Sequence, residues 1–337
     1  MRIALVTDAW FPQVNGVVRS LSKTVEHMAM AGHEVDIVSP EGLRTLPCPT
    51  YPEIRLSVGA GRHVRERLAG HDPDAIHVST EGPLGLAARR WCRRNGRAFT
   101  SAYHTQFPEY VRARLPLPLS VGYRLARWFH DAAARTLVAT PSMRRRLEDR
   151  GFRNIVTWSR GVDSGLFRPG PKDVLDLPRP LWLYFGRVAV EKGIGDFLDL
   201  NLPGTQVVIG DGPARAELQR RHPRAVFLGY KHGEDLARHV AACDVFVFPS
   251  RTDTFGLVLL EAMACGLPVA AYPVTGPLDV VVDGVTGVLR DDLREAALAA
   301  LHLDPAACRA HALRYSWEAC TQQFLDALVP ARWLTPS

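Results

Sequence analysis

LWLYFGRVAVEKGIGDFLDLNLPGTQVVIGD (181–211) decides the fold, because it contains two short apolar runs separated by a longer segment. The first run, LWLYFG (181–186), and the second, TQVVIGD (205–211), are strand-like and both end at glycine-containing turns. Short β-rich runs that alternate with longer amphipathic segments are typical of βαβ units with a parallel sheet. The stretch therefore predicts an α/β fold.

The same alternation extends over most of the chain. Other strand-like runs lie at 2–7, 33–39, 74–79, 98–103, 136–140, 225–230, 244–250 and 268–273. Between the two series, SRGVDSGLFRPGPKDVLDLPRP (159–180) is dense in Gly, Pro and Asp, as connectors are. We therefore predict two α/β domains, residues 1–165 and 166–315, and a C-terminal helix within 316–337 that packs back on the first domain. Ligands are expected where strands end, after Thr7, Ser79, Tyr103, Gly186, Gly210 and Pro249.

Composition excludes several classes of protein. The 337 residues are 47% apolar and 23% charged, and no apolar run reaches the roughly 20 residues that a membrane-spanning helix needs. The start MRIALVTDAWFPQ lacks the pattern of a secretory signal, so we expect a cytoplasmic protein. The six cysteines form no CxxC pair, which argues against a zinc site or a disulfide framework.

Charge is divided unevenly along the chain. The first 160 residues have 24 Lys and Arg against 14 Asp and Glu, a net charge of +10, whereas the remainder has 17 against 21, a net charge of −4. The excess lies in RHVRER (62–67), RRWCRRNGR (89–97) and RRRLEDR (144–150). These runs fit either solvated helix faces or attraction to an anionic membrane surface, where each cation contributes about 1 kcal/mol. No nucleic-acid recognition motif accompanies them, so we expect no nucleic-acid partner.

Two cations follow the strand-like run 181–186. Arg187 and Lys192 in FGRVAVEKG (185–193) stand where a strand is expected to end. Such cations can each bind an oxygen of a diphosphate through a charge-assisted hydrogen bond. Taken singly, Arg and Lys at a strand-to-helix turn are usually surface residues.

A second candidate region is SRTDTFGLVLLEAMACGLPVAAYPVTGP (250–277). The N–H groups at the start of the helix expected from Leu257 form a natural anion site. Asp253 precedes that start, where it or Thr254 could simply be the N-cap. Glu261 is harder to explain structurally, because a carboxylate within an apolar helix needs a partner, and a ribose diol is a suitable one. At ~1.5 Å per residue the two carboxylates are at most about 12 Å apart, so that phosphates fit between a sugar and a ribose.

These motifs together resemble glycosyltransferase family 4. The resemblance covers nearly the whole chain and rests on the motifs FGR and EKG within 185–193, GDGP (210–213), D-x7-E within TDTFGLVLLEAMACGLPV (252–269), DAWFPQVNGVVRSL (8–21), YHTQFPEY (103–110) and RGVDSGLF (160–167). It implies a GT-B fold, in which two Rossmann-like domains face each other across a cleft. The family usually has Glu-x7-Glu where this chain has Asp253, so contacts with the sugar are expected to differ.

The resemblance also implies roles for individual residues. The donor's diphosphate would be bound by Arg187 and Lys192, and its ribose by Glu261. Its sugar would be bound by Asp253 and by the N–H groups that follow, and the base would lie near the end of the strand-like run 225–230. The remaining donor-binding positions are Thr254, Phe255, Gly256, Leu257, Tyr230 and Lys231, the last of which is equally explained as surface charge.

In the first domain the resemblance points to Gly16 and His104. Gly16 in Asn15-Gly16-Val17 matches a glycine-bearing loop near the donor phosphates, where the absence of a Cβ permits close approach. A plain turn glycine is the alternative. His104 matches a histidine near the transferred sugar, although a lone histidine is more often structural. His104, Arg187, Lys192 and Asp253 are thus the predicted catalytic residues.

The similarity is greatest to GDP-mannose-dependent α-mannosyltransferases, and UDP-sulfoquinovose:diacylglycerol enzymes are also similar. It implies transfer of a hexose, mannose from GDP-mannose first, to a lipid or glycan hydroxyl with retention of configuration. No DxD-type motif follows a strand, so we expect no metal cofactor. A UDP-sugar-dependent lipid glycosyltransferase and a catalytically silent nucleotide-sugar-binding protein remain alternatives. A nicotinamide oxidoreductase is disfavoured because no GxGxxG turn follows the first strand.

Overall fold

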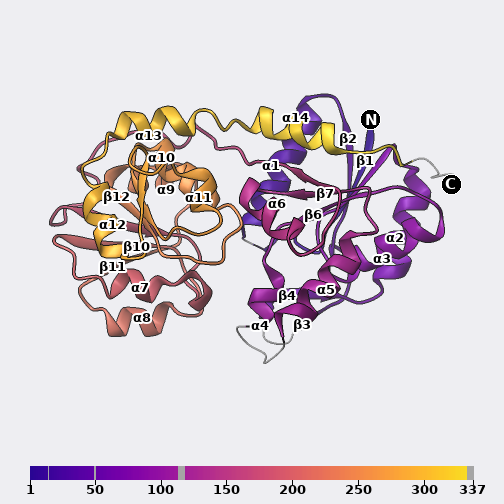
Figure 1. The fold of residues 1–337 in the computed structure, drawn as a ribbon, viewed down its shortest axis with the longest axis horizontal. Coiled ribbons are helices and arrows are strands. Elements are labelled where there is room, and N and C mark those ends of the chain that lie inside the picture. Colours follow the sequence, from indigo (N-terminus) through magenta and orange to yellow (C-terminus); the bar gives the residue numbers. More distant parts are fainter. Residues whose placement is uncertain (14, 49–50, 113–117, 332–337) are drawn as a thin grey trace. The chain divides into compact units, whose positions relative to one another are not determined.

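The protein consists of two compact α/β units, shown in the computed structural model of Figure 1. The structure describes residues 1–13, 15–48, 51–112 and 118–331. Unit 1 comprises Met1–Ser159 and the segment from Glu318 onward, and unit 2 comprises Arg160–Trp317. The chain passes between the units at Ser159/Arg160 and at Trp317/Glu318, whereas the sequence pattern puts the limits at 165/166 and 315/316.

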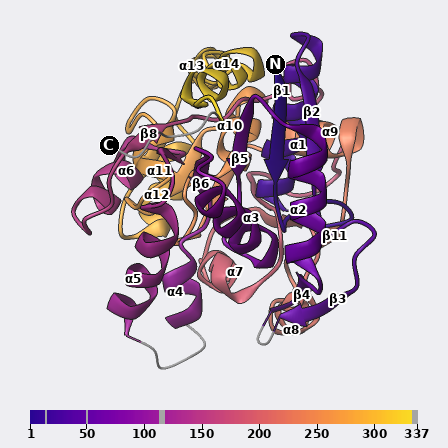
Figure 2. The same ribbon diagram turned by 90° about the vertical axis from the view of Figure 1, so that its right-hand side faces the viewer.

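Unit 1 is built on a six-stranded sheet with the order β2-β1-β5-β6-β7-β8, and every pairing in it is parallel. Its strands are β1 (Arg2–Val6), β2 (Glu34–Val38), β5 (Ala75–Val78), β6 (Thr100–Tyr103), β7 (Arg135–Val138) and β8 (Ile155–Thr157). Its helices are α1 (Gly16–Met30), α2 (Ala60–His71), α3 (Pro83–Arg94), α4 (Phe107–Arg112), α5 (Leu119–His130), α6 (Pro141–Glu148) and α14 (Trp317–Ala327). Figure 2 shows this unit with α2 and α3 toward the viewer.

Unit 2 repeats the design with the order β11-β10-β9-β12-β13-β14, again all parallel. Its strands are β9 (Leu181–Phe185), β10 (Thr205–Ile209), β11 (Val226–Gly229), β12 (Val245–Phe248), β13 (Val269–Ala271) and β14 (Gly287–Leu289). Its helices are η1 (Val190–Lys192), α7 (Ile194–Leu198), α8 (Arg215–Arg221), α9 (Gly233–Ala242), α10 (Leu257–Ala264), α11 (Pro277–Val280), α12 (Leu293–Ala300) and α13 (Pro305–Ala312).

The predicted strand-like runs all contain strands, and three regions add strands that the sequence pattern did not indicate. β8 and β14 are three-residue strands at sheet edges, too short to show a period. β3 (Thr45–Cys48) and β4 (Tyr51–Ser57) form a separate antiparallel pair. Each contains a proline, which lowers the strand signal because proline cannot donate to a ladder.

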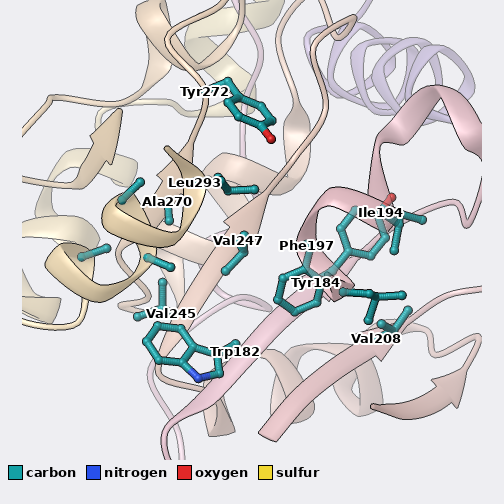
Figure 3. Packing of buried hydrophobic residues seen from close by; sticks show 14 of the residues in the cluster. Trp182, Tyr184, Ile194, Phe197, Val208, Val245, Val247, Ala270, Tyr272 and Leu293 are labelled. Atoms are coloured by element: carbon teal, nitrogen blue, oxygen red, sulfur yellow. The ribbon is translucent and has the colours of Figure 1, made fainter. Parts of the chain in front are cut away.

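The core of unit 2 packs around β9, the central strand (Figure 3). Trp182 and Tyr184 on β9 are buried together with Phe197 of α7 and with Val245 and Val247 of β12. Burying such side chains stabilises the fold by about 1.5–3 kcal/mol each. This packing fixes where β9 ends, and therefore where the residues after it lie.

Helix α14 packs on unit 1. The indole N–H of Trp158 donates to the Cys320 carbonyl at 3.1 Å, and the Trp158 ring lies 4.9 Å from that of Phe324. Farther along, the Ala331 N–H donates to the Asp74 carbonyl at 2.7 Å. The C-terminal helix thus covers the unit formed by the start of the chain.

Each sheet has one point where the strand order reverses, between β1 and β5 in unit 1 and between β9 and β12 in unit 2. Helices that follow such neighbouring strands diverge to opposite faces of the sheet, which leaves a crevice at the carboxyl ends where ligands bind. Among the described helices, none is both long and apolar enough to cross a membrane.

Candidate functional site

Arg187 lies directly after β9, at the strand reversal of unit 2. The chain leaves the strand at Gly186, whose φ of +142° suits glycine. The buried Tyr184 hydroxyl donates to the Arg187 carbonyl at 2.8 Å and so holds this turn. Burial raises the pKa of Tyr184 well above its usual value, with Asp253 and Glu191 adding to the effect, so the phenol stays neutral. The Arg187 guanidinium lies 3.7 Å from the Glu191 carboxylate.

Lys192 and Asp253, predicted from separate motifs, form an ion pair. The Lys192 Nζ lies 2.6 Å from Asp253 Oδ1, and both side chains are about four-fifths buried, with exposed fractions of 22% and 19%. Gly193 permits this approach, since its φ is +65° and a Cβ there would lie 2.7 Å from the Pro249 carbonyl oxygen. The structure thus brings the turn after β9 against the loop after β12.

The loop after β12 leaves polar atoms unsatisfied. Asp253 Oδ2 and the Ser250 hydroxyl are buried and have no hydrogen-bond partner within the described part of the chain. Buried polar groups are nearly always hydrogen-bonded, so each such atom requires an explanation. A ligand with hydroxyl groups would provide donors for the carboxylate oxygen and a partner for the serine.

Helix α10 begins at Leu257, as expected, but neither Asp253 nor Thr254 is its N-cap residue. The N-cap residue is Gly256, which has φ +80° and provides no side-chain hydrogen bond. The structural alternative for Asp253 is therefore wrong, because its carboxylate is engaged by Lys192 instead. Phe255 is buried and packs edge-on against the ring of Tyr315. The N-cap residue Gly256 thus has no side chain to occupy the first N–H groups of α10, and a helix N-terminus of this kind attracts anions.

Glu261 is buried, with 5% of its surface exposed, in a helix whose residues from Leu259 to Ala264 are all buried. The helix is therefore apolar around its whole circumference rather than on one face. A carboxylate in such surroundings costs free energy unless it is hydrogen-bonded.

The predicted base-binding residues follow β11. Tyr230 is half exposed and its ring stacks on that of His232 at 5.9 Å. Lys231 lies 3.0 Å from Asp235. The exposed Tyr230 and His232 rings offer a surface on which a base can stack.

In unit 1, the structure corrects the description of Gly16 as a loop residue. Gly16 is the first residue of α1, and the Asn15 side chain caps this helix by accepting from the N–H groups of Val17 and Val18. The residue before Asn15 lies outside the described residues. His104 follows β6 as expected, and its ring meets Trp158 edge-on at 5.8 Å.

Asp8, which the sequence reasoning did not single out, lies at the strand reversal of unit 1. Its carboxylate accepts from the N–H groups of Leu84 and Gly85 at the start of α3 and from the Thr80 hydroxyl. Burial raises the pKa of Asp8 above its usual value, although these hydrogen bonds oppose the shift. A Cβ at Gly82 would lie 2.5 Å from this carboxylate, which explains the glycine.

Glu81, also missed, is held from behind by a buried histidine. Its Oε1 lies 3.1 Å from Nε2 of His130, which is 1% exposed. His130 Nδ1 in turn lies 2.8 Å from the buried Ser101 hydroxyl. A third of the Glu81 side chain is exposed, so the carboxylate is oriented while still able to accept from hydroxyl groups. In the sequence, the TEGP stretch before α3 is the feature that could have indicated Glu81.

No three His, Cys, Asp or Glu residues within the described ranges gather as metal ligands would. The cysteines described as buried are Cys92, Cys243, Cys265, Cys308 and Cys320, and Cys48 is half-buried, all without disulfides. Burial raises the pKa of the Cys92, Cys243, Cys265 and Cys308 thiols to about 12. These thiols therefore act as apolar core groups.

Comparison with known proteins now decides the family. A family model described as "Glycosyltransferase Family 4" matches residues 14–166, and one described as "Glycosyl transferases group 1" matches residues 179–303. The chain is 32% identical to a GDP-mannose-dependent alpha-mannosyltransferase of Mycobacterium tuberculosis over 86% of this chain and 83% of that protein. The chain belongs to glycosyltransferase family 4.

Other similarities agree with this assignment. The chain is 31% identical to a sulfoquinovosyl transferase of Arabidopsis thaliana, covering 86% of this chain and 63% of that protein. The solved structure of Anabaena HepE in complex with UDP-glucose has a TM-score of 0.73 at 18% identity and covers 97% of this chain and 98% of that one. The two parallel-sheet units and this likeness confirm the GT-B fold. The protein is a glycosyltransferase.

Proposed function

We propose that the protein transfers mannose from GDP-mannose to a hydroxyl group of a lipid or glycan, with retention of anomeric configuration and release of GDP. The similarity to a GDP-mannose-dependent enzyme supports the donor. The observation that carries the proposal is the Lys192–Asp253 pair at the strand reversal of unit 2, with the buried Asp253 Oδ2 lacking a partner. A cation suited to phosphate beside a carboxylate suited to sugar hydroxyls supports the proposal.

In this proposal, different residues of unit 2 bind different parts of the donor. Arg187, Lys192 and the N–H groups at the start of α10 stabilise the charge that grows on the leaving diphosphate. Asp253 accepts from hydroxyls of the sugar, and Glu261 accepts from those of the ribose. Tyr230 and Lys231 lie beside the base. The departing phosphate takes the proton of the attacking hydroxyl on the same face of the sugar.

Unit 1 binds the acceptor in this proposal. His104 and Gly16 complete the reacting end, and Glu81 accepts a hydrogen bond from an acceptor hydroxyl. His130 and Ser101 hold the Glu81 carboxylate in place, so less conformational freedom is lost when the acceptor binds.

We further propose that transfer needs no metal, because two cationic side chains neutralise the diphosphate. Dialysis against EDTA should leave the rate unchanged. Loss of transfer on dialysis, with recovery on adding Mg²⁺ or Mn²⁺, would contradict this part of the proposal while leaving the donor assignment intact.

A second candidate donor is a UDP-sugar, which the similarity to a sulfoquinovosyl transferase favours. Incubation with GDP-mannose or UDP-glucose and mixed bacterial lipids, followed by mass spectrometry and anomeric NMR of the product, separates the candidates. GDP release with an α-mannosylated product supports the proposal. UDP release with a glucosylated product favours the alternative. Binding of either donor without transfer indicates a silent nucleotide-sugar-binding protein.

We also propose that the protein is cytoplasmic and lies peripherally at the inner face of the plasma membrane, because lipid acceptors lie there. The net charge of +10 in the first 160 residues supports such a location through attraction to anionic lipids.

A further inference from the structure

Two of the three basic runs, RHVRER (62–67) and RRRLEDR (144–150), are partly paired with acidic residues of unit 1. Arg62 pairs with Glu66, and Arg67 with Asp36, so RHVRER is partly neutralised. Arg144 and Arg146 pair with Glu148 and Glu109 in the same way. These residues offer an approaching surface less net charge than the sequence suggests.

Helices α3 and α5 differ from these runs, because neither contains Asp or Glu. Arg90 of α3 and Arg124 of α5 are exposed, and no carboxylate pairs with either of them in the part of the chain that the structure describes. Positive charge is therefore available here to an anionic partner.

Exposed apolar side chains lie beside these arginines. On α5, Val121, Leu125 and Trp128 are 45%, 65% and 48% exposed, and their spacing of four and three residues puts them on one side of the helix. Leu86 on α3 is 43% exposed. Single exposed apolar residues need no explanation, but a strip of them on an ordered helix indicates a binding surface.

Helix α3 is attached to the end of α5. The buried Arg89 guanidinium lies 3.8 Å from the centre of the Trp128 ring and donates to the Trp128 and Phe129 carbonyls. The α3–α5 face thus comprises Leu86, Arg90, Val121, Arg124, Leu125 and Trp128.

We propose that the α3–α5 face inserts its apolar side chains into the interface of an anionic lipid bilayer while its arginines contact lipid phosphates. A helix with apolar residues on one side and arginines beside them binds such interfaces, and tryptophan is favoured at headgroup level. Charge complementarity selects anionic lipid over a second copy of this chain, whose α3–α5 face would be equally positive. This inference does not depend on the donor or on transfer.

Sedimentation of the full chain with vesicles tests the proposal. Vesicles of phosphatidylcholine mixed equally with phosphatidylglycerol should bind the protein, vesicles of phosphatidylcholine alone should bind it weakly, and added salt should lower binding to the mixed vesicles. Leu125→Ser should lower the partition coefficient at least about fivefold, since apolar insertion is lost. Arg90→Gln combined with Arg124→Gln should lower binding to the anionic vesicles alone.

Two control variants match these changes. Leu313→Ser removes another exposed leucine, 50% exposed against 65% for Leu125, and Arg224→Gln removes an exposed arginine, both in unit 2. Both should bind as the unchanged protein does, and thermal unfolding should show that Leu125→Ser is folded. Equal binding of Leu125→Ser and the unchanged protein would overturn the proposal. A dimer that forms without lipid and that Leu125→Ser dissociates would also overturn the proposal, because the face would then join two copies of the chain.

Discussion

The carboxyl edges of the two sheets are built alike and differ in charge. In unit 2 the residues beside the strand reversal are Arg187, Lys192 and Asp253, so cations meet a carboxylate. In unit 1 the corresponding residues are Asp8 and Glu81, which belong to the turns after β1 and β5. The same topology thus provides one edge suited to phosphate and one suited to hydroxyl groups.

The difference shows that the fold determines where ligands bind, while a few side chains determine which ligands bind there. Each edge contains a glycine that lets a neighbouring group approach the backbone closely, Gly193 in unit 2 and Gly82 in unit 1. The two edges differ only in the chemical groups that lie beside these glycines. Removing charged groups from each edge in turn should therefore impair the binding of different substrates.

The largest effect is expected from Lys192→Ala and Arg187→Ala. Either change should lower kcat/KM about a hundred- to a thousandfold, because a charge-stabilising group is removed from the transition state. Steady-state kinetics with GDP-mannose measures this. Arg290→Ala, which also breaks an ion pair in unit 2, should leave the rate unchanged. Equal losses for all three variants would indicate that only stability has changed.

A smaller effect is expected from Glu261→Gln. The variant should bind GDP about tenfold more weakly, because a charged acceptor of ribose hydroxyls becomes neutral. Calorimetry with GDP measures the affinity, and a thermal scan without GDP checks that the buried amide is tolerated. Unchanged affinity would contradict a role for Glu261 in binding the ribose.

Glu81→Gln should affect only the acceptor side. We expect the KM for the acceptor to rise about fivefold with the KM for the donor unchanged, because one charged hydrogen bond is weakened. Kinetics that vary each substrate in turn, with the lipid fraction that accepts mannose, provide the measurement. His130→Asn should show the same division if the histidine acts by positioning Glu81. A rise in the KM for the donor would contradict the assignment of the two edges to different substrates.

The smallest effect concerns pH and Asp8. Burial raises its pKa in the folded protein, so above the unfolded value the native state binds more protons than the unfolded state. The contribution of Asp8 to stability should thus fall as pH rises through its folded pKa. Asp8→Asn should remove this decline, which urea unfolding at several pH values can detect. Identical pH dependence in the two proteins would contradict the assignment.

Much of unit 2 could be predicted from the sequence, because its strands are continuous apolar runs and its cations directly follow one of them. The partnership of Lys192 with Asp253 could not, since it depends on how the turn after β9 meets the loop after β12. Asp8 and Glu81 were missed for the same reason. A single acidic residue in a loop carries no pattern, and only the packing of α3 and His130 shows what it contacts.

The most direct test of the central claim is calorimetric titration of the unchanged protein and Lys192→Ala with GDP, GDP-mannose and UDP-glucose. We expect the unchanged protein to bind GDP and GDP-mannose more tightly than UDP-glucose, and Lys192→Ala to weaken binding of both guanine nucleotides. Equal affinity of the two proteins for GDP would contradict the assignment of unit 2's edge to the diphosphate.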